Sequence, residues 1–160
     1  MDHVDHILAQ WAIERPDLDV APMGVIGRLS RAVARVQSQL DATFTRHGID
    51  SGTFDVLATL TRQGAPYRIT PAQLAEDAMV TSSAVAQRLN RLEALGLIRR
   101  LPHPEDRRGK LVELTSAGAE LVDSVLPDHL ATEEDLLSSL SAEERRTLAS
   151  LLGRVGSTTG

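Results

Sequence analysis

The chain has 160 residues, a formal net charge of −5 and no cysteine. Disulfide bonds, thiol catalysis and cysteine-based metal or iron–sulfur sites are therefore excluded. Aromatic residues make up 2% of the sequence and hydrophobic residues 42%, so we expect a core of aliphatic side chains packed between helices. The N-terminal stretch MDHVDHILAQW lacks the basic flank and the apolar run of a signal peptide, and no segment is apolar enough to span a bilayer. We expect a soluble cytoplasmic protein.

Helical periodicity dominates the first part of the chain. The apolar spacing of residues 4–11 predicts a short amphipathic helix, which the sequence RPDLD ends. A long apolar stripe predicts a second helix over residues 23–47, followed by a glycine stop. A third helix over residues 51–63 is expected, with Ser51 as its cap.

A tight pair of helices follows. Thr70 and Pro71 predict a helix start, because a capping hydroxyl precedes a proline at the first helical position. The segment TPAQLAEDAMVTSSAVAQRLNRLEALG then divides into a short helix, a turn at AMVT and a second helix that ends at Gly96. This order is typical of a helix–turn–helix, in which the first helix fixes the second against DNA.

Two short strands, LIRRL and KLVEL, are expected after the helix pair, and the loop between them closes a β-hairpin. Thr115 begins another long helix, which we expect to be interrupted or bent at Pro127. A capping box from Ser141 to Glu144 starts a final helix that reaches about Val155. The predicted fold class is mainly α, a winged helix–turn–helix with a two-stranded β-hairpin wing.

Cationic side chains concentrate in the helix pair and the hairpin. Residues 80–110 carry seven basic and three acidic side chains, whereas the rest of the chain carries 10 basic and 19 acidic ones. A local cationic patch on an acidic chain indicates a polyanionic partner at one face. The alternative is a solvated loop in which the arginines occur by chance.

The second helix of the pair is expected to present a polar face to solvent. On a helical wheel its apolar side chains share a narrow arc, and its polar side chains lie opposite. Hydroxyl, amide and guanidinium groups on such a face match base edges and phosphates in a major groove, and arginines on the adjoining loop suit a minor groove. Asp106 stands close enough to Arg108 to hold its guanidinium in a carboxylate pair. The candidate DNA-binding residues are Ser82, Ser83, Gln87, Asn90, Arg91, Asp106, Arg107, Arg108 and Lys110.

The stretch LNRLEALGLIRRLPHPEDRRGKLVELTSAG closely resembles the signature of the MarR family of winged helix–turn–helix regulators. That signature runs RLE-x-x-GL, D-x-R and V-x-LT-x-x-G, and this chain matches it between Arg91 and Gly118. The resemblance implies a homodimer that binds a pseudo-palindromic operator in double-stranded DNA. Ala86 stands where many relatives have threonine, and Asn90 where many have aspartate, so the family's operator preference does not carry over.

The resemblance also implies a division of the chain into three parts. Residues 1–48 hold the N-terminal helix and the first long helix, which serve dimerisation and border an effector pocket. Residues 49–115 form the winged helix–turn–helix DNA-binding domain. Residues 116–160 supply the C-terminal helices that complete the helical dimerisation region.

Four residues resemble the effector site of the urate-responsive subgroup of the MarR family. Its Trp, Asp, Arg, Arg set is matched here by Trp11, Asp55, Arg62 and Arg88. Arginines neutralise and orient a flat anion, an indole covers its face, and an aspartate accepts a ring N–H. An anion bound by Arg88 would move the recognition helix and so couple the pocket to DNA. The implied effector is urate or another small aromatic or carboxylate compound. Alternatively, Arg88 binds a phosphate, Trp11 packs a terminal helix, and Asp55 and Arg62 form a surface pair.

Other classes of function fit the residues less well. The five histidines are scattered and no nucleophile motif or P-loop occurs, so we expect no enzyme and no cofactor. His129 and Glu133 stand four apart on a helix, a spacing that can chelate a metal, but two ligands make a weak site. A purely structural dimer would leave Gln87 and Arg108 without a role. The sequence therefore predicts a dimeric DNA-binding repressor released by a small effector. The alternative is a metal-responsive or effector-independent regulator of the same fold.

Overall fold

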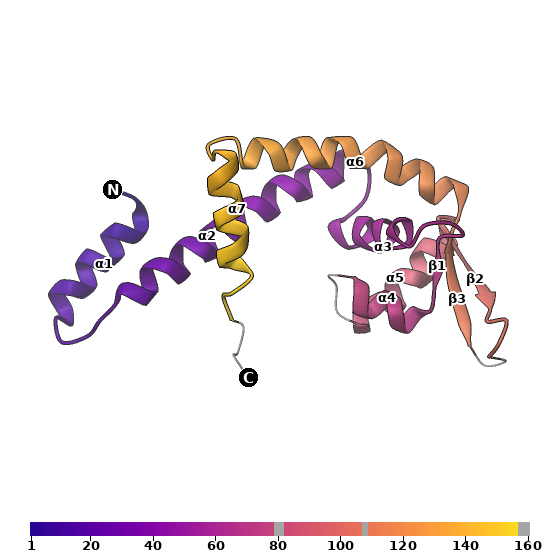
Figure 1. The fold of residues 1–160 in the computed structure, drawn as a ribbon, viewed down its shortest axis with the longest axis horizontal. Helices are drawn as coiled ribbons and strands as arrows, with labels where there is room; N and C mark the ends of the chain where they lie inside the picture. Colours follow the sequence, from indigo (N-terminus) through magenta and orange to yellow (C-terminus); the bar gives the residue numbers. More distant parts are fainter. Residues whose placement is uncertain (79–81, 107–108, 157–160) are drawn as a thin grey trace. The chain divides into compact units, whose positions relative to one another are not determined.

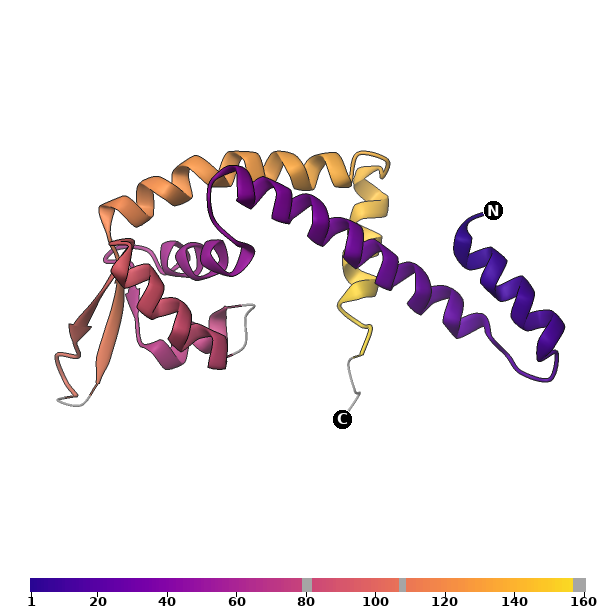
Figure 2. The same cartoon turned by 180° about the vertical axis from the view of Figure 1, so that it is seen from behind.

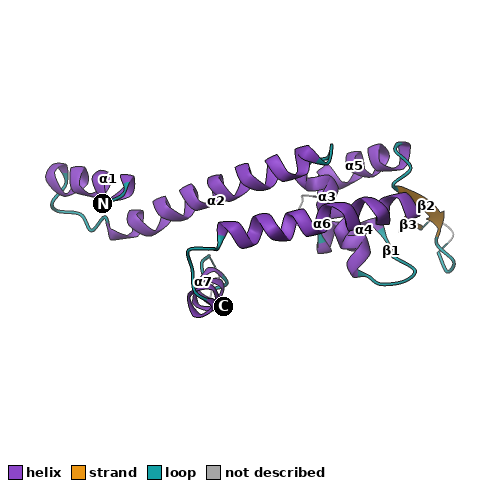
Figure 3. Ribbon diagram, turned by 90° about the horizontal axis from the view of Figure 1, so that it is seen from above, coloured by secondary structure: helices purple, strands orange, loops and turns teal. Residues whose placement is uncertain are grey.

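The computed structural model describes residues 1–78, 82–106 and 109–156, except for the side chains of residues 82–84. Within these residues the chain forms seven α-helices and one three-stranded sheet (Figures 1 and 3). The mainly α fold class is confirmed. None of the described helices is long and apolar enough to cross a membrane. In chain order the elements are α1 (His3–Glu14), α2 (Ala21–Arg46), α3 (Ser51–Arg62), β1 (Arg68–Ile69), α4 (Pro71–Asp77), α5 (Ser82–Ala94), β2 (Ile98–Pro102), β3 (Lys110–Leu114), α6 (Ser116–Leu136) and α7 (Ala142–Leu152).

The chain divides into two compact units, and the boundary lies inside α2. Unit 1 comprises Met1–Gln39 and unit 2 comprises Leu40–Gly160. In unit 1, α1 packs on the first part of α2 through Val4, which is only 4% exposed. Gly24 allows a close approach of the two helices, because a Cβ there would lie 3.1 Å from Leu8 Cδ1.

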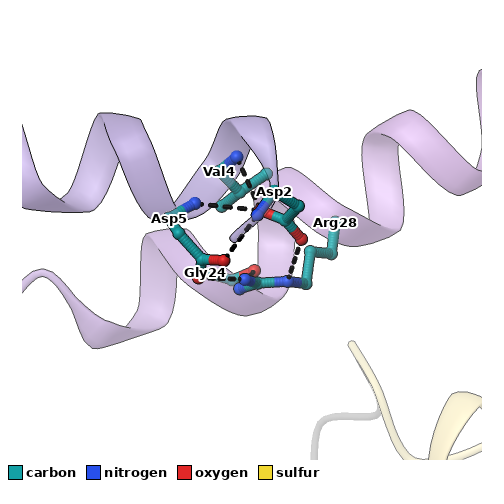
Figure 4. Close-up of polar contacts among 5 residues, drawn as sticks. All are labelled: Asp2, Val4, Asp5, Gly24 and Arg28. Carbon is teal, nitrogen blue, oxygen red and sulfur yellow. Dashed lines mark hydrogen bonds and ion pairs between the residues drawn. The ribbon is translucent and has the colours of Figure 1, made fainter.

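Ion pairs at the start of α1 complete this packing (Figure 4). Arg28 Nε donates to Asp2 Oδ2 at 2.9 Å, and Arg28 Nη2 donates to Asp5 Oδ1 at 2.5 Å. The same two aspartates form the capping box of α1. Backbone N–H donors first, and Arg28 as well, lower the pKa of Asp2 and of Asp5 and outweigh the opposing effect of desolvation.

The core of unit 2 lies between α3, α4, α5, the sheet and the start of α6 (Figures 1 and 2). It is built from aliphatic side chains, as the composition predicts. The buried members are Val56, Leu57, Leu60, Ile69, Leu74, Val85, Leu89, Leu92, Ile98, Val112, Leu114 and Val122. A second, smaller cluster joins Phe44, Phe54 and Val125. The ring of His129 stacks on Phe44 and lies tilted against Phe54.

Helix starts in unit 2 follow local capping chemistry, with one difference from the sequence prediction. Thr70 caps α4 and Ser141 caps α7, each in a complete capping box, as predicted. The cap of α3 is Asp50 rather than Ser51, because the Asp50 carboxylate accepts the N–H of Thr53 at 2.7 Å. Ser51 is thereby the first helical residue.

Helix α6 runs unbroken through Pro127, so it is not interrupted there, and a bend at Pro127 stays a prediction. Proline removes one N–H from the helix, but Pro127 is exposed and the carbonyl that loses its partner can be hydrated. On the opposite side Val122 and Val125 are buried in the two core clusters and hold the helix in place. The final helix, α7, ends at Leu152 instead of Val155.

The sheet is antiparallel with strand order β1-β3-β2. The predicted hairpin of β2 and β3 is confirmed, and its register pairs Arg100 with Val112. A third strand, β1, pairs Arg68 with Glu113 on the other edge of β3, so the predicted two-stranded wing is in fact part of a three-stranded sheet. The sequence PYRI predicts a brief extended piece here, but two residues are too short to show that this piece pairs with β3.

Candidate nucleic-acid interface

Helix α5 is attached to unit 2 along one apolar face. Val85 and Leu89 are each 2% exposed, and Leu92 is completely buried. The predicted apolar arc is therefore confirmed. Gln87 and Asn90 are exposed, and the helical repeat places both on the side away from that arc.

Helix α4 packs next to α5 and belongs to the same core. Pro71 occupies its first turn, and Thr70 accepts the N–H of Gln73 at 3.2 Å while the Gln73 side chain accepts the N–H of Thr70 at 3.1 Å. Leu74, completely buried, joins α4 to the cluster that contains Leu89. The described part of the predicted helix–turn–helix thus has the packing that such a motif requires.

The hairpin of β2 and β3 forms a wing beside α5. At its end His103 N donates to the carbonyl of Gly109 at 3.1 Å. The imidazole Nδ1 of His103 accepts the N–H groups of Glu105 and Asp106, both at 3.2 Å. These bonds fix the first half of the loop between the strands.

Four of the predicted DNA-binding side chains lie outside the described residues. Arg107 and Arg108 lie outside the described residues, and so do the side chains of Ser82 and Ser83. The predicted pair between Asp106 and Arg108 therefore stays a prediction. Lys110 is exposed at the first position of β3, and Arg91 is exposed on α5.

Arg100, on β2, connects the wing to α5, which the sequence prediction missed. Its N–H donates to Glu93 Oε1 at 3.1 Å and its Nη1 donates to Glu93 Oε2. Its Nη2 donates to Asn90 Oδ1 at 2.7 Å. One arginine thus holds two side chains of α5.

Arg99, the preceding residue, makes a separate set of contacts within the sheet. Its guanidinium donates to Glu113 Oε1, and Arg68 Nε lies 3.2 Å from Glu113 Oε2. Glu113 is only 6% exposed, and two arginines compensate its charge. Successive side chains on a strand point to opposite faces. Because of this alternation, the sequence LIRRL indicates that its two arginines lie on opposite faces of the sheet and have different partners.

Arg88, assigned by resemblance to the effector set, joins α5 to the start of α3. Its Nη1 donates to the carboxylate of Asp50 and to Thr53 Oγ1, the latter at 3.4 Å. Arg91 Nη1 lies 3.6 Å from the other oxygen of Asp50. Partial burial acts to raise the pKa of Asp50, but the Thr53 donors and Arg88 outweigh it and hold that pKa below its usual value. The two helices are thus joined through one carboxylate.

The two arginines of the predicted effector set contact opposite ends of α3. Arg62, in the last turn, donates through Nη2 to Thr59 Oγ1 at 2.9 Å and to the carbonyl of Asp77 at 3.3 Å, whereas Arg88 binds the cap at the first turn. Asp55 is half-buried on the same helix.

Trp11 lies on α1 in unit 1 and is 40% exposed. A hollow of about 430 Å³ is lined by Trp11 with Gln10, Ile13 and Glu14. The indole is therefore accessible to a small molecule in that unit.

The described residues contain no group of three or more His, Asp or Glu side chains suited to an ion. His129 and Glu133, the pair considered from the sequence, contact each other, with Nε2 and Oε1 3.2 Å apart.

Comparison with known proteins identifies relatives along nearly the whole chain. A family model described as MarR family matches residues 47–109. The chain is 45% identical over 152 residues to the HTH-type transcriptional regulator PecS of Dickeya dadantii (strain 3937), with 95% of this chain and 92% of that protein covered.

Solved structures share the fold. A MarR family transcriptional regulator from Streptomyces coelicolor, in complex with DNA, superposes with a TM-score of 0.79 at 25% identity, over 86% of this chain and 87% of that one. BpsR of Bordetella bronchiseptica, whose DNA binding is regulated by 6-hydroxynicotinic acid, superposes with a TM-score of 0.75 at 25% identity, over 84% and 94%.

Proposed function

Because the chain belongs to the MarR family, we propose that it is a dimeric transcriptional repressor that binds DNA through α5 and the wing. The observation that carries this proposal is the polar, exposed face of α5 opposite a fully buried apolar one. The exposed amides of α5 can form hydrogen bonds with base edges in a DNA groove, and the cations of the neighbouring hairpin can bind the DNA backbone.

In the proposed complex α5 lies in the major groove, with Gln87, Asn90 and Arg91 toward the DNA. The wing extends to the neighbouring minor groove, where Arg107, Arg108 and Lys110 meet its negative potential. Asp106 and the hydroxyls of Ser82 and Ser83 complete the proposed contact set. The net charge of −5 opposes indiscriminate binding, so the local cationic surface decides where DNA attaches.

Large apolar side chains outside the core favour a dimer. Exposed examples in unit 1 are Ile13, Leu18, Met23, Val25, Ile26, Val33 and Val36. Exposed examples in unit 2 are Leu126, Leu130, Leu148, Leu151, Leu152 and Val155. So many apolar groups on one small protein indicate a protein interface, and a second copy would give a two-fold axis and half-sites about one helical turn apart.

We also propose that a small aromatic anion, such as urate, releases the repressor from DNA by acting on Arg88. Arg88 joins α5 to Asp50 at the cap of α3. An anion that binds Arg88 competes with Asp50 and so changes the attachment of α5. Trp11, Asp55 and Arg62 belong to the proposed set through the family resemblance. The regulation of BpsR by 6-hydroxynicotinic acid supports an aromatic anion as the class of effector.

DNA binding through the wing is tested by the salt dependence of affinity. We would measure fluorescence anisotropy of a labelled duplex, obtained by binding-site selection, with wild type, Arg108→Ala and Arg15→Ala. The two variants change the net charge equally, and Arg15 pairs with Asp17 in a loop between α1 and α2. Only Arg108→Ala should flatten the salt dependence, by about 0.9 in logarithmic slope for each lost phosphate contact. Identical slopes for the two variants would contradict the assignment of the wing.

The effector is tested by the fluorescence of Trp11, the only tryptophan. Urate and 6-hydroxynicotinic acid would each be titrated into wild type, Arg88→Ala and Arg91→Ala. We expect saturable quenching in wild type and in Arg91→Ala, and weaker binding in Arg88→Ala. Equal affinity in all three proteins would exclude Arg88 as the effector ligand, and absence of quenching by either compound would exclude both as effectors.

A further inference from the structure

The contact between Arg100 and Asn90 restricts which base Asn90 can recognise. Arg100 Nη2 donates to Asn90 Oδ1 at 2.7 Å. A guanidinium has donors only, so the amide oxygen must face Arg100 and the orientation of the amide is fixed. Two N–H donors of Asn90 Nδ2 then remain for a partner on the exposed side of α5.

Glu93 keeps Arg100 in this position. Its two carboxylate oxygens accept the backbone N–H and Nη1 of Arg100. The side chain of Arg100 is 29% exposed and that of Glu93 is 39% exposed, so the pair lies at the edge of the solvent-facing surface. Asn90 and Glu93 are three residues apart on α5, one turn along the helix, and Arg100 spans that turn from β2.

Base recognition by asparagine ordinarily uses both ends of the amide. Paired with adenine, the oxygen accepts from N6 and the nitrogen donates to N7. Here the oxygen already accepts a charge-assisted bond, and a second donor approaching it would meet the positive charge of Arg100. Guanine instead presents two acceptors, O6 and N7, on its major-groove edge. A surface that offers only donors is complementary to that edge and repels the amino groups of adenine and cytosine.

We propose, on the basis of the function proposed above, that Asn90 and Arg100 together form a donor-only surface that selects guanine at one base pair of each half-site. Asn90 contacts the base. Arg100 is a positioning residue: it occupies the amide oxygen of Asn90, so that this oxygen does not accept from a base. Glu93 accepts the backbone N–H and Nη1 of Arg100 and so holds its Nη2 on the oxygen of Asn90.

Arg99 provides the matched control for Arg100. It is the adjacent residue on β2 and carries the same charge. It donates to Glu113 on β3, and none of its described contacts reaches α5. Replacing either arginine by methionine removes one positive charge from the sheet and keeps a side chain of similar length. Only the Arg100 variant frees the oxygen of Asn90.

The test is binding-site selection from a randomised duplex library with four proteins: wild type, Asn90→Asp, Arg100→Met and Arg99→Met. Wild type should enrich guanine at one position per half-site, and Arg99→Met should recover the same site. Asn90→Asp keeps the bond from Arg100 but removes the donors, so guanine should lose its advantage there. Arg100→Met should lower the guanine-to-adenine ratio at that position about fivefold or more, the low end of what one bidentate contact discriminates.

An unchanged preference at every position in both Asn90→Asp and Arg100→Met would overturn the proposal, as would adenine at the affected position in wild type. If Arg100→Met does not fold, as judged by circular dichroism, Asn90→Asp alone decides, because it retains the contact with Arg100. Failure of wild type to enrich any DNA is a different result, which would refute the proposed function itself.

Discussion

Replacing Gly52 by alanine tests whether Arg88 is held at the start of α3. A Cβ on residue 52 would lie 2.4 Å from Arg88 Cζ and 2.5 Å from Arg88 Nη2. The guanidinium would therefore have to leave its position beside Asp50. The loss of this partly exposed ion pair costs about 0.5–1 kcal/mol. Alanine in place of glycine within a helix contributes up to about 1 kcal/mol in the opposite direction. The two effects should nearly cancel in the wild-type background.

A double-mutant cycle separates the two effects. In an Arg88→Ala background no guanidinium stands in the way, so Gly52→Ala should raise the free energy of unfolding by about 0.5–1 kcal/mol. The coupling between the two sites should be about 1 kcal/mol. Urea denaturation followed by circular dichroism, at one protein concentration because the protein is proposed to dimerise, gives the four free energies. The same stabilisation in both backgrounds would refute the placement of Arg88 over Gly52.

Three further substitutions test the fold and its response to pH. A Cβ on Gly118 would lie 2.2 Å from the carbonyl oxygen of Leu97, a backbone atom that cannot yield, whereas on Gly153 the nearest atom would be 3.6 Å away. Gly118→Ala should therefore lower the free energy of unfolding by about 2 kcal/mol or more, whereas Gly153→Ala should change it little. Similar melting temperatures for the two variants would contradict the close packing of Gly118 against Leu97. The pKa of Asp50 is lowered in the folded protein. Its carboxylate therefore stabilises the fold at any pH above the unfolded pKa of about 3.9. This stabilisation is lost as the pH falls through the folded pKa. Wild type should thus be more stable than Asp50→Asn at pH 7. In urea titrations, the difference in the free energy of unfolding between the two proteins should shrink below about pH 4. A difference that does not change with pH would argue against a charged role for Asp50.

The fold was predictable from the sequence where local chemistry determines it. Thr70 and Ser141 cap helices because the capping pattern lies within four residues. The buried face of α5 follows from the spacing of Val85, Leu89 and Leu92. The strand β1 was not predicted as part of the sheet, because a two-residue strand exists only through its pairing with β3, more than forty residues later.

The candidate site was predictable only in part, for the same reason. The exposure of Gln87 and Asn90 follows from the helical repeat, but the partners of the arginines do not. Arg88 binds Asp50, 38 residues away, and Arg100 binds Asn90 across a change from helix to strand. Such pairs depend on how the elements pack, which spacing along the chain does not specify.

The proposed placement of two α5 helices in successive major grooves is tested most directly by dimethyl sulfate footprinting of the selected duplex. This reagent methylates guanine N7 in the major groove and adenine N3 in the minor groove. We predict two clusters of protected N7 atoms with centres about 10 base pairs apart, related by the symmetry of the operator. A single cluster, or protection of adenine N3 alone, would contradict binding by paired recognition helices.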